Sequence, residues 1–271
     1  MPFSPPQVQA FLQLVRDRWG YDFSGYAEAS LQRRLRRCAE LAHTQSLEKL
    51  GQRLQSDPHA FTWFLENFTV NVTEMFRDPE FYAYLRKHIF PVLETFPHIN
   101  IWHAGCSTGE EVYSMAIMLH ESGLLSRCRI YATDINPANL EKARAGIVPT
   151  PMLKEYIQNY RHSGGVGDFT QYYTALYGNA IFQKELRERI TFLQHNLVAD
   201  GAFNEFQLII CRNVFIYFKR SLQEQVLGLF ADSLAPLGYL ALGTKESILS
   251  SRAQSRFELV SRPMKIYRKK F

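Results

Sequence analysis

A run of small and acidic residues at positions 104–111 is the strongest chemical signal in this sequence. The run reads AGCSTGEE and lies between a predicted strand at 99–105 and a predicted helix at 110–121. Small residues let a backbone turn sharply and approach a ligand closely. Because the run lacks the full G-x-G-x-x-G pattern of dinucleotide binders, on its own it fits a tight strand–helix turn equally well.

An acidic residue, Asp134, follows at the end of the next predicted strand, which begins at Arg129. In doubly wound nucleotide-binding folds, an acid about 20 residues after the glycine loop accepts hydrogen bonds from ribose hydroxyls. Asp134 also stands shortly before Asn136-Pro137, so a helix-capping role is the alternative. The spacing to the glycine loop favours a ribose site.

Polar residues also follow two later strands. Asn196 and Leu197 come just after a predicted strand at 190–193, where a polar group can meet an adenine edge. Arg212-Asn213 follows the buried strand FQLIIC and precedes an aromatic stretch that contains Tyr217. Ligands bind at the carboxyl ends of strands in such sheets, so this pattern favours a site. For Arg212, an ion pair with a nearby carboxylate is the alternative.

The elements that position these residues fall into two patterns. Residues 1–75 are predicted to be helical, with helices at 26–42, 46–55 and 60–67 and Ser46 as an N-cap. Strands and helices alternate after a linker helix at 76–98, which predicts an α/β domain at 99–271 with a mostly parallel, doubly wound sheet. The segment 147–190 interrupts the alternation as an insertion with a small hairpin.

Composition limits the classes of protein that fit. The chain has 271 residues, 46% of them hydrophobic and 21% charged, which is ordinary for a globular enzyme. No run approaches the roughly 18 apolar residues of a membrane span, and the N-terminus lacks a signal-peptide pattern, so we expect a cytoplasmic protein. The four cysteines have no zinc-site spacing, so no metal is predicted. A net charge of +5 does not require a nucleic-acid partner.

The predicted helix around residues 31–42 carries an arginine-rich face. Its apolar residues, among them Leu31, Leu35 and Cys38, fall on the other side of the helix. A solvated basic face is the alternative to a binding surface. The arginines concerned are Arg33, Arg34, Arg36 and Arg37.

Several separated blocks together resemble the CheR-type chemotaxis-receptor glutamate O-methyltransferases. Their order and spacing agree with that family across nearly the whole chain. The blocks are Asn71 to Pro79, Ala104 to Glu111, Ala132 to Ile135, Asn196-Leu197, Cys211 to Phe218 and Gly243 to Ser247. The resemblance implies a Rossmann-like class I methyltransferase domain, an N-terminal all-helical domain and a small inserted β-subdomain. It also implies S-adenosylmethionine as methyl donor and S-adenosylhomocysteine as product.

The resemblance implies roles for the site residues. Asn71, Thr73 and Arg77 line the methyl and methionine end of the cofactor, and either Glu110 or Glu111 meets its ammonium group. Ala104 lies in the cofactor loop, Asp134 holds the ribose, and Asn196 with Leu197 holds the adenine. Arg212 and Asn213 complete the pocket, and Arg77 and Tyr217 act at the reaction centre.

The implied partner is the cytoplasmic, glutamate-rich helical region of a methyl-accepting receptor, which the arginine-rich helix would complement electrostatically. The insertion matches the family's β-subdomain in position, but its Gly164–Gly167 stretch departs from the version that docks a receptor peptide. We expect a monomer without membrane insertion. Two alternatives are a methyltransferase of another substrate class and a non-catalytic signalling protein that senses S-adenosylmethionine.

Overall fold

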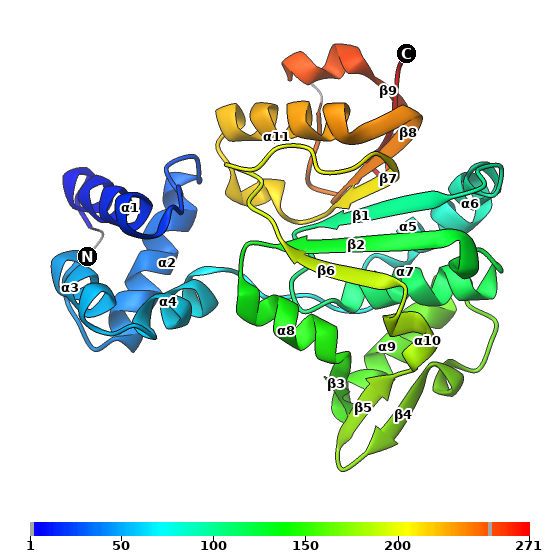
Figure 1. The fold of residues 1–271 in the computed structure, drawn as a ribbon, viewed down its shortest axis with the longest axis horizontal. Helices are drawn as coiled ribbons and strands as arrows, with labels where there is room; N and C mark the ends of the chain where they lie inside the picture. The colour runs from blue at the N-terminus through cyan, green and yellow to red at the C-terminus, as the bar shows by residue number, and fades with distance from the viewer. Residues whose placement is uncertain (1–2, 249–250) are drawn as a thin grey trace.

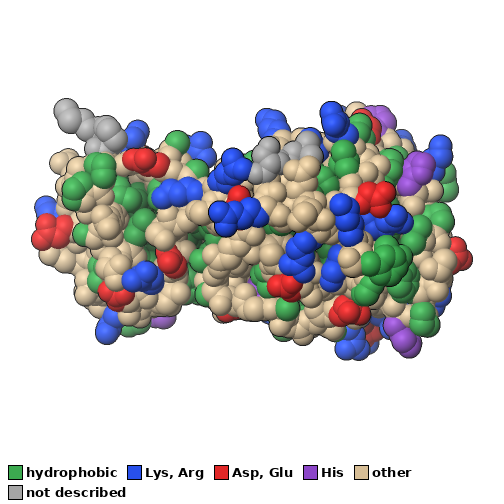
Figure 2. All heavy atoms as spheres, turned by 90° about the horizontal axis from the view of Figure 1, so that it is seen from above, with side chains coloured by type: hydrophobic (Ala, Val, Ile, Leu, Met, Phe, Trp, Pro, Cys, Tyr) green, Lys and Arg blue, Asp and Glu red, His purple; other side chains and the backbone are tan. Residues whose placement is uncertain are grey.

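The computed structural model describes residues 3–248 and 251–271. A bundle of helices at the N-terminus lies beside a larger α/β part, to which it is joined by an extended segment (Figure 1). Seen from above, the two lobes meet at a narrower waist, and Lys and Arg side chains are spread along this face (Figure 2). In the described residues, no helix is both long enough and apolar enough to cross a membrane.

The N-terminal bundle has a core of its own, built around Phe11, Leu35 and Phe64. Three of its helices match the predicted ones to within two residues. The Ser46 side chain accepts a hydrogen bond from the Lys49 backbone N–H, which confirms the predicted N-cap. The helices are α1 (Pro5–Trp19), α2 (Glu28–Leu41), α3 (Leu47–Ser56) and α4 (Ala60–Phe68).

A seven-stranded sheet in the order β6-β2-β1-β7-β8-β10-β9 forms the centre of the larger part. The pairs from β6 through β8 are parallel, and only β10 pairs antiparallel, with β8 and β9. This confirms the predicted mostly parallel sheet. The strands are β1 (Ile99–Ala104), β2 (Cys128–Asp134), β6 (Ile190–Gln194), β7 (Phe206–Cys211), β8 (Leu234–Leu242), β9 (Phe257–Ser261) and β10 (Ile266–Lys269).

Helices cover both faces of this sheet. On one face lies α11 (Arg220–Ser233), and on the other lie α7 (Glu110–Glu121) and α8 (Pro137–Ala145) (Figure 1). Each layer has its own apolar core, with Met115 on the α7 side and Phe230 on the α11 side. The connection before β1 and three short turns complete the part: α5 (Pro79–Tyr84), η1 (Leu85–Ile89), α6 (Phe90–Leu93), η2 (Leu125–Arg127), η5 (Phe215–Tyr217) and η6 (Arg252–Arg256).

The inserted segment contains the predicted hairpin within a three-stranded antiparallel sheet, in the order β3-β5-β4. It also contains a helix that the sequence analysis did not predict, whose buried Tyr156 and Tyr160 join the core on the α7 side. The elements are β3 (Ile147–Pro149), η3 (Thr150–Met152), α9 (Leu153–His162), η4 (Phe169–Tyr172), β4 (Tyr173–Leu176), β5 (Asn179–Phe182) and α10 (Lys184–Arg187).

Backbone hydrogen bonds seat the N-terminal part on the turn that follows β7. The Ala27 N–H donates to the Tyr217 carbonyl at 2.8 Å, and the Lys219 N–H donates to the Gly25 carbonyl at 2.7 Å. Between them, Tyr26 and Phe218 form an isolated antiparallel bridge. The segment before α2 therefore pairs with the chain around η5 as a short strand would.

Candidate active site

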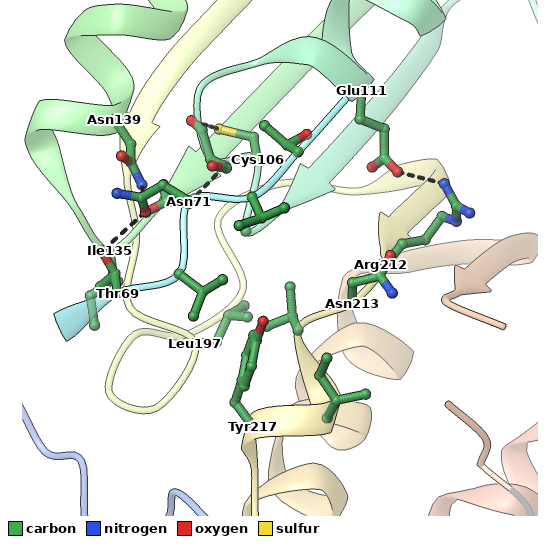
Figure 3. Close-up of a pocket in the computed structure, with 18 of the residues that line it drawn as sticks. Thr69, Asn71, Cys106, Glu111, Ile135, Asn139, Leu197, Arg212, Asn213 and Tyr217 are labelled. Atoms are coloured by element: carbon green, nitrogen blue, oxygen red, sulfur yellow. Dashed lines mark hydrogen bonds and ion pairs between the residues drawn. The ribbon is translucent and has the colours of Figure 1, made fainter. Parts of the chain in front are cut away.

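A pocket of about 360 Å³ lies where the carboxyl ends of β1, β2 and β7 meet the segment between α4 and α5 (Figure 3). Most of the residues singled out in the sequence line it. These are Asn71, Thr73, Arg77, Glu111, Asp134, Asn196, Leu197, Arg212, Asn213 and Tyr217. Five of the other predicted residues, Ala104, Glu110, Arg33, Arg36 and Arg37, are not among the lining residues.

The β1–α7 turn is tight at two glycines. Gly105 has φ 79°, and a Cβ on it would lie 2.6 Å from Cγ2 of Val214. Gly109 has φ 95°, and a Cβ there would lie 3.0 Å from that of Ala143. Both positions therefore require glycine. Since Gly105 and its two successors also line the pocket, the run serves as a close-packed turn and as a pocket wall together.

Asp134 is buried at the end of β2, at the edge of the pocket. Its carboxylate accepts hydrogen bonds from the backbone N–H of Ser107 at 2.8 Å and of Asn136 at 2.9 Å. Burial raises the pKa of Asp134, and these bonds oppose that rise. The N-cap of α8 is Asn136, whose side chain accepts from the Ala138 N–H at 3.0 Å, so the alternative of Asp134 as the cap is wrong.

Of the two glutamates at the start of α7, only Glu111 faces the pocket. Its carboxylate lies 3.1 Å from Nδ1 of His103 and 3.0 Å from Nη1 of Arg212. Burial raises the pKa of Glu111, but the His103 bond and the Arg212 charge outweigh it and lower the pKa below its usual value. Glu110 instead accepts from the Thr108 hydroxyl at 2.7 Å.

Arg212 ties three segments together at the end of β7. Its side chain is 1% exposed and bonds Asp78 at 2.5 Å as well as Glu111. It also donates to the Arg77 carbonyl at 3.2 Å and lies 4.2 Å from the ring centre of Phe81. The ion-pair alternative is therefore confirmed, and Arg212 lines the pocket in addition.

The wall between α4 and α5 is held by asparagines that the sequence analysis missed. Asn139 donates to the Asn71 side chain at 2.9 Å, and Asn136 donates to the Thr69 hydroxyl at 3.0 Å. Figure 3 shows Asn71 and Asn139 facing each other at one side of the pocket. The signal for them was the Asn-Pro-Ala-Asn stretch that begins two residues after the end of β2.

The turn that carries Asn213 and Tyr217 is anchored by Glu246, which the sequence analysis did not single out. The buried Glu246 carboxylate accepts from the backbone N–H of Gly243 at 2.6 Å, Asn213 at 3.0 Å and Ile216 at 3.2 Å. Asn213 itself has φ 61°. The sequence contains one signal for Glu246: it lies in the block Gly243 to Ser247, which resembles the corresponding block of the CheR-type family.

Comparison with known proteins decides the family. The model of the CheR methyltransferase all-alpha domain matches residues 6–69, and that of the CheR methyltransferase SAM binding domain matches residues 71–266. The chain belongs to the CheR methyltransferase family. It is therefore an S-adenosylmethionine-dependent methyltransferase, and the predicted resemblance and fold class are confirmed.

Individual relatives agree with this assignment. A Pseudomonas putida protein named as a candidate methyltransferase, Cher3, is 46% identical over 97% of this chain and 96% of its own length. The chemotaxis protein methyltransferase of Listeria innocua is 32% identical over 89% of each chain. That of Escherichia coli K12 is 31% identical over 96% of this chain and 90% of its own.

The pocket of this CheR-family chain suits a polar, nucleotide-like donor. Buried polar atoms of several lining residues have no hydrogen-bond partner among the described residues, namely Ser107 Oγ, Asn139 Oδ1 and His195 Nδ1. Such atoms are costly unless a ligand or water meets them. Within 3–248 and 251–271, no three His, Cys, Asp or Glu side chains gather as a metal site requires.

The arginine-rich face of α2 differs from the prediction at one position. Arg33, Arg36 and Arg37 are exposed, as expected. Arg34 is buried, 5% exposed, and lines the pocket. It follows the apolar side of α2 because Ser30 Oγ and the Phe68 carbonyl accept its hydrogen bonds. The prediction that Arg34 belongs to the exposed binding face is wrong.

Proposed function

We propose that this enzyme transfers the methyl group of S-adenosylmethionine to glutamate side chains of a methyl-accepting chemotaxis-type receptor. The products would be glutamate methyl esters and S-adenosylhomocysteine. The observation that carries the proposal is the arrangement of arginines in the pocket. Arg212 is already paired with Glu111 and Asp78, whereas Arg34 and Arg77 line the pocket and form no ion pair with a described residue. Two cations in one pocket suit a carboxylate acceptor.

The names of the relatives support the same substrate class. Those of Listeria innocua and Escherichia coli are chemotaxis protein methyltransferases. With this chain, the acceptor would be the cytoplasmic, glutamate-rich helical region of the receptor. We propose that the enzyme works in the cytoplasm as a monomer, without a nucleic-acid partner and without inserting into the membrane.

We further propose how the lining residues divide the donor between them. Glu111 would meet the ammonium group, because its pocket-facing carboxylate is held ionised by Arg212 and His103. Asp134 would hold the ribose, and Asn196 with Leu197 the adenine. The methyl and methionine end would lie against Asn71, Thr73, Arg77, Arg212 and Asn213, with Ala104 and Glu110 supporting the loop from behind.

The chain's own residues then have little chemistry to perform. When bound, S-adenosylmethionine supplies an electrophilic methyl group on a sulfonium. A glutamate carboxylate is ionised at neutral pH, so no general base is needed. Arg77, with its planar fork, would orient the carboxylate, and Tyr217 would shape the passage to the methyl group. Alignment of the reacting atoms and exclusion of water would provide the rate enhancement.

The division of labour along the chain is also a proposal. Residues 1–75 would form a receptor-facing helical domain, and 76–98 a linker helix. Residues 99–271 would form the catalytic domain, with the insertion at 147–190 as its small β-subdomain. The exposed Arg33, Arg36 and Arg37 would face the acidic receptor helices.

One experiment tests the function directly. The enzyme is incubated with labelled S-adenosylmethionine and receptor-rich membranes, and the protein label is then exposed to base. Methyl esters hydrolyse in base, so the proposal expects base-labile label on a receptor band. Base-stable label would indicate another substrate class. Binding of S-adenosylmethionine with no transfer to any fraction would indicate a sensing protein instead.

A further inference from the structure

His195 follows β6 directly and lies beside the end of β2. Its backbone N–H donates to the Asp134 carbonyl at 3.3 Å, and both residues line the pocket. The end of β6 lies beyond that of β2 when the sheet is followed from β1, in the order β1-β2-β6. A methyl donor whose ammonium group meets Glu111 and whose ribose meets Asp134 therefore brings its base to the end of β6.

One ring nitrogen of His195 is already engaged. Nε2 lies 3.1 Å from the carbonyl oxygen of Gly201, which only accepts hydrogen bonds. In the neutral ring this bond requires the proton on Nε2, so Nδ1 keeps its lone pair and is an acceptor. The ring centre lies 5.2 Å from those of Trp102 and Phe203, so packing and the Gly201 bond together hold the ring in one orientation.

Nδ1 of His195 is an acceptor without a donor. It is buried and has no hydrogen-bond partner in the part of the chain that the structure describes, and the residue is 8% exposed. A buried acceptor that stays unpaired costs free energy. The next residue is better satisfied, because Oδ1 of Asn196 accepts from the Val198 N–H at 3.0 Å. Nδ1 therefore needs a donor that the described chain does not supply.

We propose that Nδ1 of His195 accepts a hydrogen bond from the 6-amino group of the donor's adenine, and so makes the pocket selective for adenine over purines without that group. Adenine carries its N–H donors on this group alone, whereas its ring nitrogens accept. A site built to bind an N–H rejects an analogue that lacks it, because the site's own polar atom is then left unpaired. The inference rests on the proposed placement of the adenine beside Asn196 and Leu197, and it does not depend on the methyl acceptor.

A purely structural role is the competing explanation. His195 would then serve only to hold the loop at 195–203 through Gly201 and to pack on Trp102. Two amide substitutions separate the ring nitrogens, because the amide of asparagine reaches about as far as Nδ1 and that of glutamine about as far as Nε2. His195→Asn keeps an acceptor for the adenine without the bond to Gly201, and His195→Gln keeps a donor for Gly201 without the acceptor.

The test measures two affinities by calorimetry for each protein. One ligand is S-adenosylhomocysteine, and the other is its analogue with hydrogen in place of the 6-amino group. We expect the wild type to bind S-adenosylhomocysteine about tenfold more tightly than the analogue, as expected for one buried acceptor left unpaired. His195→Asn should keep this ratio, whereas His195→Gln should reduce it to less than about threefold.

His103→Gln is the matched control. His103 is also buried, with Nδ1 bonded to Glu111 and Nε2 unpaired among the described residues, but it does not line the pocket. Because Glu111 would bind the ammonium group that both ligands share, this variant should lower both affinities by the same factor. The ratio between them should stay at about tenfold.

The ratio of the two affinities decides the inference. If the wild type binds both ligands equally, or if His195→Gln keeps the wild-type ratio, the inference is overturned. Should His195→Gln not fold, His195→Phe takes its place, because it keeps the ring packing and also lacks the acceptor. The base-labile label on a receptor tests the proposed function separately, and its absence would leave this ratio unchanged.

Discussion

The carboxylate of Glu111 accepts a hydrogen bond from Nη1 of Arg212 at 3.0 Å, joining the first turn of α7 to the end of β7. Both side chains are largely enclosed, with 17% and 1% exposed. Because two strand–helix connections meet in this pair, it fixes the pocket wall before any ligand arrives. Removing Glu111 would leave Arg212 paired with Asp78 alone, and removing Arg212 would leave Glu111 with only its hydrogen bond to His103, so either change weakens the compensation of a buried charge.

Exchange of Glu111 for glutamine should therefore weaken the binding of S-adenosylmethionine more than the same change at its neighbour. We expect at least about a tenfold loss of affinity for Glu111→Gln, because a hydrogen bond to a charged group contributes about 1.5–3 kcal/mol. Glu110→Gln, which alters a side chain bonded to Thr108, should change affinity less than about threefold. Calorimetric titration of both variants checks this, and the reverse order would assign the ammonium group to Glu110.

Glu111 should also make the stability of the protein depend on pH in the acidic range. Its pKa in the folded protein lies below the ordinary 4.5, because His103 and Arg212 outweigh the effect of burial. A lowered folded pKa gives stability that is present above the unfolded pKa and is lost as pH falls through the folded one. The difference in unfolding free energy between wild type and Glu111→Gln should shrink as pH falls below 4.5. Denaturant titrations from pH 7 downward measure this difference, and a constant gap would contradict it.

The elements that position the site could be predicted because they rest on local signals. The helix at 110–121 was found at its predicted bounds, since its acids, apolar spacing and preceding glycine are all near in sequence. Asp134 and Arg212 could be placed in one pocket because the carboxyl ends of parallel strands meet at one edge. By contrast, the choice between Glu110 and Glu111 depends on His103 and Arg212, which no local pattern brings near.

Two other outcomes show where the sequence signal was weak or absent. Arg34 stands three residues after Leu31 and four before Cys38, so helical spacing already places it beside buried residues. The prediction nevertheless placed Arg34 on the exposed face, because three other arginines lie close to it in the sequence. Glu246 gave no such signal, because its partners Asn213 and Ile216 are brought near only by the tertiary fold.

Arg77→Ala should reduce turnover while the protein stays folded. Arg77 is half-buried in the pocket wall, and its loss would leave the acceptor carboxylate poorly oriented. We expect kcat to fall about 100-fold, as misplacement of a reacting group commonly does. Steady-state methylation and a thermal melt measure the two properties, with Arg129→Ala, an exposed arginine on β2, as the control. Unchanged turnover would remove Arg77 from the reaction centre.

Charge reversal on α2 should impair receptor methylation in a salt-dependent way. The double variant Arg36→Glu with Arg37→Glu changes two exposed residues, so folding and the binding of S-adenosylmethionine should be preserved. We expect about a tenfold loss of kcat/KM for a receptor fragment at low salt, shrinking at high salt as screening increases. Arg16→Glu with Arg18→Glu on α1 makes the same change in net charge elsewhere on the bundle. If both double variants lose the same kcat/KM, the α2 arginines do not bind the receptor and form only a solvated surface.

Glu246→Gln should destabilise the protein and loosen the turn that carries Tyr217. Oε2 of Glu246 accepts from Gly243 and Asn213, and Oε1 accepts from Ile216, so the amide NH₂ of a glutamine would oppose at least one backbone donor whichever way it is turned. We expect a loss of about 1–3 kcal/mol in unfolding free energy for each donor left unpaired.

The same variant should bind S-adenosylmethionine more weakly, since Asn213 lines the pocket and would lose its anchor. Glu258→Gln serves as the control, because Glu258 is 55% exposed and forms a surface pair with Arg268. That change should cost less than about 1 kcal/mol. Denaturant unfolding and calorimetry on the two variants measure both effects. A Glu246→Gln protein as stable as Glu258→Gln would show that the buried carboxylate does not hold the turn.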